Sequence, residues 1–247
     1  MGQDVESLRA RLCRLTADRA LTTLEEAVAF LNDRGLLTRM ADCALPSLFG
    51  ACHEEAGNPA GRGFDLWPKS KWIWSFQLTA GSRGLLTKMH RGKSLYLSTA
   101  ATRIFDPVVR QAIADATGDD ARLLEHLSRH GPSLNADVQL ELGWDSKRLK
   151  SVRNRLERLG AVVSDGLVFE SSSSWYFAPM RPWDQVVTEP AHSDDPHGDL
   201  LVAGVKAAVV APEAELSSWF SWPIPPGTID RLLRAGRLAR PEPGLLA

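Results

Sequence analysis

The stretch from Gly118 to Trp183 has the clearest alternation of hydrophobic and polar positions in the chain. Apolar residues recur at helical spacing, and the third predicted helix places Leu149, Val152 and Leu156 on one stripe. The pattern predicts helices over 121–130, up to Gly143, and over 146–159, followed by strands over 161–163, 167–169 and 175–177. Helix, turn, helix and then a hairpin is the order of a winged helix, which commonly places one helix in a DNA groove.

The segment before it predicts a second, more irregular unit of the same kind. Thr23 and Glu26 have the spacing of a capping box, and the helix that follows ends at Gly35. A short helix is expected over Leu45–Cys52. Aromatic alternation over 72–76 predicts a strand, and further strands are expected over 85–88 and 94–98 around a turn at 91–93.

The last segment predicts a third helix-turn-helix, cut short. Helices are expected over 200–210, from Pro212 to Phe220 and around 229–233, and Arg237–Ala239 is a candidate wing strand. The fold class is therefore α+β, with tandem winged helix-turn-helix units. The expected boundaries are 1–117 for the N-terminal unit, 118–183 for the winged helix, 184–198 for an exposed acidic linker and 199–247 for a truncated C-terminal unit.

Composition favours a cytoplasmic globular protein. The 247 residues are 44% hydrophobic and 24% charged, and no apolar run approaches the ~20 residues of a membrane span. Cys13, Cys43 and Cys52 have no paired spacing, so reduced thiols are expected. No signal-peptide pattern precedes them.

Charge is unevenly distributed along the chain although the net charge is only −1. Residues 66–105 contain no acid, whereas residues 184–215 contain seven acids and one cation, Lys206. The low net charge argues against coating nucleic acid by bulk charge, and the uneven distribution favours a single binding face.

Cationic side chains in two places are the candidate DNA contacts. Those on the 146–159 helix can lie on one side, as Lys147 and Lys150 do at a spacing of three, where a recognition helix would carry them. The alternative is a solvated helix face. The candidates are Lys147, Arg148, Lys150 and Arg155 on the helix, and Lys69, Lys71, Arg83, Lys88, Arg91 and Lys93 on the basic hairpins.

Aromatic residues are interleaved with the hairpin cations, from Trp67 through Trp72, Trp74 and Phe76 to Tyr96. Such rings can stack on bases, but alternate rings also fill a core. The core interpretation is favoured.

Two histidines have the spacing of a metal pair. His126 and His130 are four residues apart, but Leu127 occupies the position of the metalloprotease glutamate. A histidine at the end of a helix also interacts favourably with the helix dipole. The sequence therefore predicts no metal and no cofactor.

Short motifs resemble the AlkZ-related family, relatives of the AlkZ (YcaQ-like) winged-helix DNA glycosylases. They are the run 29–36, the run 45–48, and Lys88 with Arg91-Gly92-Lys93, and the similarity extends from about Thr22 to Arg240. The resemblance implies tandem winged helices around a DNA-binding concavity. For the glycosylases it also implies excision of alkylated or crosslinked bases.

The catalytic motif of those glycosylases is missing. No glutamine in this chain is followed two residues later by Gln or Asp, the pair that positions the attacking water. Asp65, beside the basic aromatic segment, is a weak candidate for a catalytic acid.

The expected function is therefore that of a DNA-binding protein without a complete catalytic motif. Double-stranded DNA is the predicted partner, and no membrane association is expected. An active glycosylase remains an alternative. So does a protein–protein scaffold or transcriptional regulator, with a protein partner bound through the acidic C-terminal unit.

Overall fold

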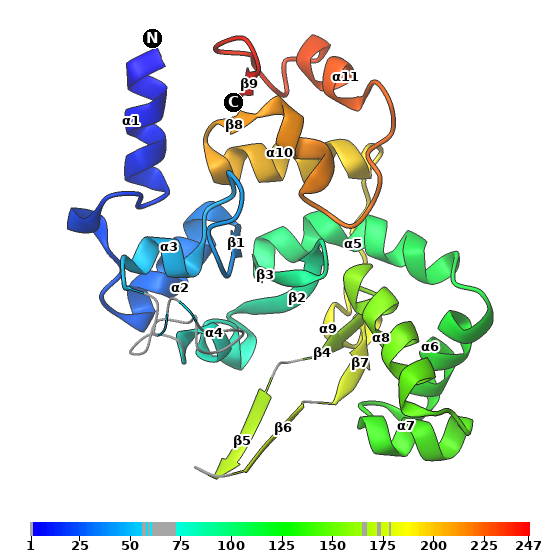
Figure 1. Cartoon of the computed structure of the whole chain (residues 1–247). Coiled ribbons are helices and arrows are strands. Elements are labelled where there is room, and N and C mark those ends of the chain that lie inside the picture. The colour runs from blue at the N-terminus through cyan, green and yellow to red at the C-terminus, as the bar shows by residue number, and fades with distance from the viewer. Residues whose placement is uncertain are drawn as a thin grey trace.

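The computed structural model describes residues 2–55, 58, 60, 73–164, 167–171, 174–177 and 179–247. Helices dominate and the sheets are small, so the α+β class is confirmed (Figure 1). Within these residues no helix combines the length and apolar character needed to cross a membrane.

The N-terminal unit surrounds a three-stranded antiparallel sheet in the order β1-β3-β2. Half of the predicted capping box of α2 forms: Thr23 accepts from the backbone N–H of Glu26, whereas the Glu26 carboxylate accepts from the backbone N–H of Thr22. The elements are α1 (Gly2–Leu12), a 3-10 turn (Ala17–Arg19), α2 (Leu24–Arg34), β1 (Leu36–Thr38), α3 (Leu48–Cys52), α4 (Trp74–Gln77), a second 3-10 turn (Ala80–Ser82), β2 (Gly84–His90), β3 (Lys93–Ser98) and α5 (Thr99–Ala114).

The middle unit contains the three helices predicted from periodicity. Its first strand pairs with its last, β4 with β7, and β5 pairs with β6. The elements are α6 (Gly118–His130), α7 (Asn135–Leu142), α8 (Ser146–Arg158), β4 (Val162–Ser164), β5 (Leu167–Ser171), β6 (Ser174–Phe177), β7 (Met180–Pro182) and α9 (Trp183–Val186). The predicted turn Asp165-Gly166 lies outside the described residues.

The C-terminal unit is smaller but holds paired strands of its own. It comprises α10 (Pro196–Ala208), β8 (Ala211–Pro212), a 3-10 helix (Glu213–Ser218), α11 (Thr228–Arg234) and β9 (Leu245–Leu246). Strand β8 pairs with β9, and Ala239 and Ala247 exchange backbone hydrogen bonds of 2.8 and 2.9 Å.

One order of elements recurs in all three units: helix, short extended segment, helix, helix and then extended segments, which are four strands in the middle unit and two segments in the others. In each unit the first extended segment pairs with the last. Strand β1 pairs with β3, Ser133 bridges to Met180 of β7, and β8 pairs with β9. The chain therefore repeats one topology without an obvious sequence repeat.

The C-terminal unit shares its hydrophobic core with the N-terminal unit. One buried cluster runs from Leu36 through Phe105 to Leu246, and the rings of Phe105 and Phe220 meet edge to face at 5.2 Å. The middle unit has a separate cluster around Leu123, Leu149 and Leu156. The segment after residue 198 is thus packed onto the first unit.

Several sequence expectations were wrong in detail. Residues Trp74–Gln77 form a short helix, α4, because five alternating residues are too few to distinguish a strand from a helical turn. Helix α3 begins only at Leu48: Ser47 caps it, and Pro46 is held by a hydrogen bond from Thr38 N–H to its carbonyl.

The C-terminal segment also departs from expectation. The helix expected from Pro212 to Phe220 is a 3-10 helix over Glu213–Ser218, and Arg237–Ala239 is not a named strand, although Ala239 does pair. The expected exposed linker is partly ordered by contacts, because Ala191 N–H donates to Asp106 and Asp195 caps α10.

Candidate nucleic-acid interface

Helix α8 presents a polar arc to solvent and an apolar stripe to the core. Asp145 caps its N-terminus by accepting from Arg148 N–H at 2.7 Å. Leu149, Val152 and Leu156 are buried, whereas Lys147 and Lys150 are exposed. Neither lysine has an ion-pair partner among the described residues, so both are available to an anion.

Two other predicted contacts on α8 are paired with acids of α6. Arg148 binds Asp119 through Nε and Nη2 at 2.8 and 2.6 Å, and Arg155 binds Asp120 in the same bidentate manner. The hydrogen bond from Arg148 lowers the pKa of Asp119, which stays ionised. These pairs hold two of the four predicted α8 cations against the first turn of α6.

The C-terminal half of α8 is joined to the N-terminal unit. Glu157 is 2% exposed; it accepts from Arg153 Nε at 2.8 Å and from Lys88 of β2. Burial raises the pKa of Glu157, but the charges of Arg153 and Lys88 outweigh it and the net shift is downward. Lys88, which the sequence predicts as a DNA contact, therefore links the two units through the buried carboxylate of Glu157.

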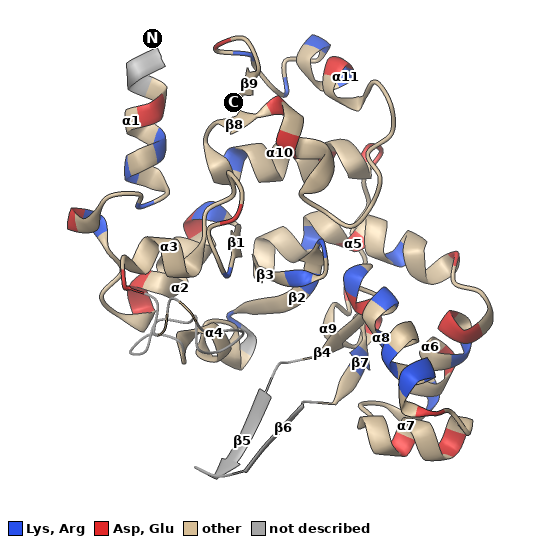
Figure 2. Cartoon of the chain, in the orientation of Figure 1, with Lys and Arg blue, Asp and Glu red and all other residues tan. Residues whose placement is uncertain are grey.

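The turn between β2 and β3 lies beside the end of α8. A Cβ built on Gly92, whose φ is +81°, would sit 3.4 Å from Cδ of Arg158. Arg91 and Lys93 flank this glycine, and both pair with Asp42. The turn therefore lies next to the end of α8, and Figure 2 shows Lys and Arg positions on both elements.

The remaining predicted contacts are not gathered there. Arg83 precedes β2, about 20 Å along the strand from the turn. Lys69, Lys71 and the candidate acid Asp65 lie outside the described residues, as do Trp67 and Trp72.

A hollow of about 370 Å³ opens beside the same turn. Its lining includes Arg39, Lys88 and Lys93 together with Asp42 and His90. Burial raises the pKa of Asp42, but the hydrogen bond and the charge of Lys93 act in the opposite direction, and the net shift is downward. The hollow therefore holds an ionised acid within a cationic wall.

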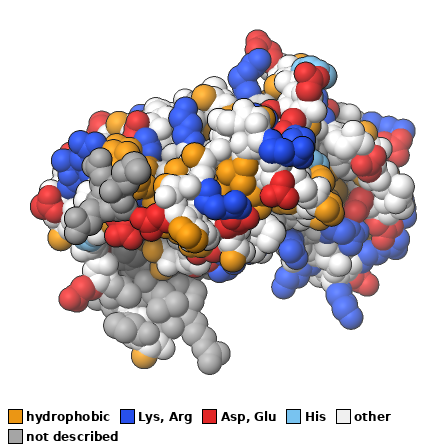
Figure 3. Space-filling model, turned by 90° about the horizontal axis from the view of Figure 1, so that it is seen from above, with side chains coloured by type: hydrophobic (Ala, Val, Ile, Leu, Met, Phe, Trp, Pro, Cys, Tyr) orange, Lys and Arg blue, Asp and Glu red, His pale blue; other side chains and the backbone are white. Residues whose placement is uncertain are grey.

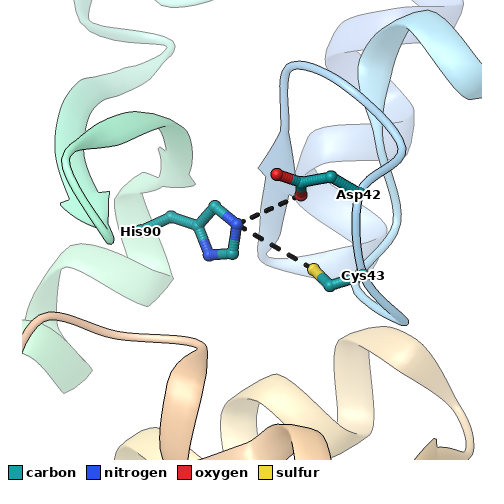
Figure 4. Close-up of side chains that lie close together, drawn as sticks. All are labelled: Asp42, Cys43 and His90. Atoms are coloured by element: carbon teal, nitrogen blue, oxygen red, sulfur yellow. Dashed lines mark hydrogen bonds and ion pairs between the residues drawn. The ribbon is translucent and has the colours of Figure 1, made fainter.

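The His90 ring lies close to Asp42 and Cys43 in the wall of this hollow (Figure 4). Its Nδ1–H donates to the carbonyl of Trp219 at 2.6 Å, so the neutral ring keeps its lone pair on Nε2, where Arg91 donates at 2.8 Å. Asp42 Oδ1 and Cys43 Sγ lie 3.2 and 4.0 Å from Nε2. Burial lowers the pKa of His90 and the imidazole is neutral.

Cys43 is a poor nucleophile despite its nearness to His90. Burial raises the pKa of its thiol to about 11, so it stays protonated near neutral pH. The cluster could offer donor atoms to a metal, but the Arg91 and Lys93 charges already lie against Asp42. A second group of potential ligands, His126, His130 and Glu141, is on α6 and α7.

Of the described aromatic residues near the hairpins, Tyr96 lies in the core and Trp74 and Phe76 are half-buried. Tyr96 is fully buried, and its hydroxyl accepts from Arg39 Nε at 3.0 Å. The Arg39 guanidinium lies 5.9 Å from the ring centroids of both Tyr96 and Phe76. The core interpretation is thus confirmed for Tyr96.

The acids of the C-terminal unit are largely paired with arginines that follow them. Asp195 binds Arg231 and Arg237, and Glu213 binds Arg240. Seen from above α10 and α11, cationic and anionic side chains are interspersed (Figure 3). The acidic excess in the sequence therefore does not become a continuous acidic surface on this face.

Sequence reasoning missed Arg39, Asp42 and His90 as neighbours of the hairpin cations. No motif spacing links them, because the loop after β1 and the end of β2 meet only in the folded sheet. No protein-family model, curated protein or solved structure matches the chain.

Proposed function

We propose that this chain binds double-stranded DNA across its N-terminal and middle units, each acting as a winged helix. The observation that carries the proposal is the position of Arg158 beside Gly92, where an added Cβ would lie 3.4 Å from Cδ of Arg158, because it brings the exposed arc of α8 next to the β2–β3 turn. The repeated order of helices and paired strands supports the winged-helix assignment.

The chemistry of the surface suits phosphate contacts. Lys147 and Lys150 are exposed and without acidic partners among the described side chains, and Asn154 on the same arc offers an amide for a base edge or a sugar. Arg148 and Arg155 are tied to Asp119 and Asp120, so they rank below the two lysines as contacts. We therefore expect Lys147 and Lys150 to provide most of the helix's electrostatic affinity.

The test is the affinity of K147Q/K150Q for a fluorescent duplex at 0.1 M salt. Each lost phosphate contact removes about 0.9 log units of counterion-release affinity at this salt concentration, so two should weaken binding about 60-fold. The matched control is K206Q/R234Q, which removes two exposed cations from α10 and α11. Its affinity should equal that of the unsubstituted chain.

Equal affinity for both double variants would refute α8 as the DNA-contacting helix. Absence of any duplex binding, together with salt-insensitive capture of a protein, would favour the scaffold alternative. Neither outcome is expected if Lys147 and Lys150, which have no acidic partner among the described residues, contact the phosphates.

A second candidate function is base excision, and the hollow beside the turn favours it. Its volume of about 370 Å³ is in the range of small-ligand pockets, and Asp42 places an ionised carboxylate in its wall. A carboxylate can stabilise positive charge on a sugar after the base is flipped out. Lys93 and Arg91 already neutralise Asp42, which weakens this candidate relative to binding alone.

Incubation with an alkylated duplex, followed by detection of abasic sites, tests this second function. Abasic sites formed by the unsubstituted chain and lost in D42N would establish it. No abasic sites, with duplex binding retained, would leave DNA binding as the function.

A further inference from the structure

Three side chains with metal-binding atoms lie together on α6 and α7, two helices that Figure 1 shows as neighbours. His126 and His130 lie one turn apart on α6, and their rings stack with centroids 4.7 Å apart and 24° between planes. Glu141 of α7 faces both rings: its Oε2 lies 3.4 Å from His126 Nδ1 and 3.6 Å from His130 Nε2.

These separations match the coordination shell of a tetrahedral ion. Bonds of about 2.0–2.1 Å to nitrogen and oxygen give ligand–ligand edges of about 3.3–3.4 Å. The three donor atoms all lie within 4.8 Å of one another, so a small rotation of one imidazole closes the set. We propose that His126, His130 and Glu141 bind a first-row divalent transition ion such as Zn²⁺, with water in the fourth position.

One of the three proposed ligands is buried and the other two are partly exposed, so the site is both anchored in the protein and open to solvent. His126 is buried, and its Nε2 has no hydrogen-bond partner among the described residues, so its polar contact is the one with Glu141. Side chains of His130 and Glu141 are 54% and 45% exposed, which leaves a path for an ion from solvent. His126 is therefore held in place by packing, whereas His130 and Glu141 are free to adjust their side chains around an ion.

The protonation state also suits a metal. Burial lowers the pKa of His126, and the neighbouring His130 acts in the same direction, although Glu141 opposes them. A neutral imidazole is the form that coordinates an ion. No competing cation from a lysine or arginine pairs with Glu141 among the described residues, in contrast to Asp42 beside His90.

The donor set is that of the His₂Glu zinc sites of metalloproteases, with the two histidines four residues apart. In those enzymes a glutamate follows the first histidine and acts as general base. Here Leu127 follows His126 and is fully buried in the middle unit's core. The site therefore binds an ion without that base, and its effect is to brace α7 against α6.

Fixing the position of α7 should also stabilise the start of α8, because the two helices share a side-chain hydrogen bond. The Gln139 side chain of α7 donates to Ser146 Oγ at the start of α8, at 2.8 Å. An ion held by Glu141 fixes the helix that carries Gln139. Metal binding should therefore raise the melting temperature of the protein.

The test is Zn²⁺ binding to the full chain after chelator treatment, measured by equilibrium dialysis and by thermal unfolding. We expect one Zn²⁺ per chain and a melting temperature that rises until one equivalent is added. H130Q and E141Q should each weaken binding at least about 100-fold, because each removes a direct ligand. Tetrahedral Co²⁺ should give visible d–d bands that both variants lose.

Two matched variants complete the design. H192Q removes an exposed histidine that pairs with Asp194, and C43S removes the potential ligand beside His90. Both should bind Zn²⁺ like the unsubstituted chain. No stoichiometric Zn²⁺ in the unsubstituted chain, unchanged binding by H130Q and E141Q, or loss of binding in C43S would each overturn the proposal. His130 is half exposed, so H130Q should melt at the metal-free temperature of the parent.

Discussion

The buried carboxylate between the first two units gives the sharpest stability prediction. Replacing Glu157 with glutamine keeps the volume of the side chain and removes its charge. Lys88, Arg153 and the Ser164 hydroxyl all donate to this carboxylate, Arg153 at 2.8 Å and Ser164 at 2.7 Å. The substitution leaves two cations facing a neutral amide.

The expected cost follows from how buried each cation is. Side-chain exposure is 43% for Lys88 and 10% for Arg153, so water can replace the lost partner at Lys88 but much less at Arg153. Breaking a buried ion pair costs about 3–5 kcal/mol. Arg153 keeps hydrogen bonds to Asn135 and Ser164, at 2.8 and 2.9 Å, which places E157Q at the lower end, about 3 kcal/mol.

Urea unfolding at pH 7 measures this loss as about a hundredfold change in the folding equilibrium. The control is E125Q, which breaks the exposed Glu125–Arg129 pair and should cost less than about 0.5 kcal/mol. The pKa of Glu157 is lowered in the folded state, so its stabilisation is present above the unfolded pKa and disappears as the pH falls through the folded pKa. The difference between the two proteins should therefore shrink on acidification. A loss below about 1 kcal/mol at pH 7, or one that does not depend on pH, would refute the reasoning.

Three further perturbations test other parts of the fold. G160A should cost about 2–3 kcal/mol in urea unfolding, because Gly160 has φ +71° and an added Cβ would lie 2.7 Å from Met89 Sδ; a neutral effect would contradict this packing. D106N should cost about 3 kcal/mol by the same assay, since the fully buried Asp106 accepts from Trp183 Nε1 at 2.7 Å and from Arg110. A loss of unfolding free energy as small as that of a surface substitution would show that these hydrogen bonds do not stabilise the fold. Burial lowers the pKa of His90, so its stabilisation is complete above about pH 6.5 and is lost as the pH falls through the folded pKa. The melting temperature should fall over that window, and H90Q should fall less steeply; parallel curves would be inconsistent with a neutral buried imidazole.

The middle unit was the part most open to sequence prediction. Helices α6 and α8 each have an apolar stripe, whereas α7 buries only Val138; all three have a glycine at or just beyond the end, so these local signals agree with the final structure. Strand β7 was missed because three residues carry too little pattern. The expected strand over 72–76 failed for the same reason.

The candidate site was less predictable than the helices that carry it. Charge spacing identified Lys147 and Lys150, but it could not reveal that Arg148 and Arg155 pair with Asp119 and Asp120, about thirty residues earlier. Such pairs depend on how α8 crosses α6. Likewise, two histidines were visible as a helical pair, whereas their third partner, Glu141, is brought in only by the turn between α6 and α7.

The most direct measurement of DNA binding is the dependence of duplex affinity on salt. Plotting log affinity against log salt should give a clearly negative slope for the unsubstituted chain, and K147Q/K150Q should flatten it by about 1.8. R158Q, beside Gly92, should flatten it by a further amount of about 0.9 if the turn and α8 share one duplex. A slope near zero, or slopes that do not change in these variants, would contradict the proposed interface.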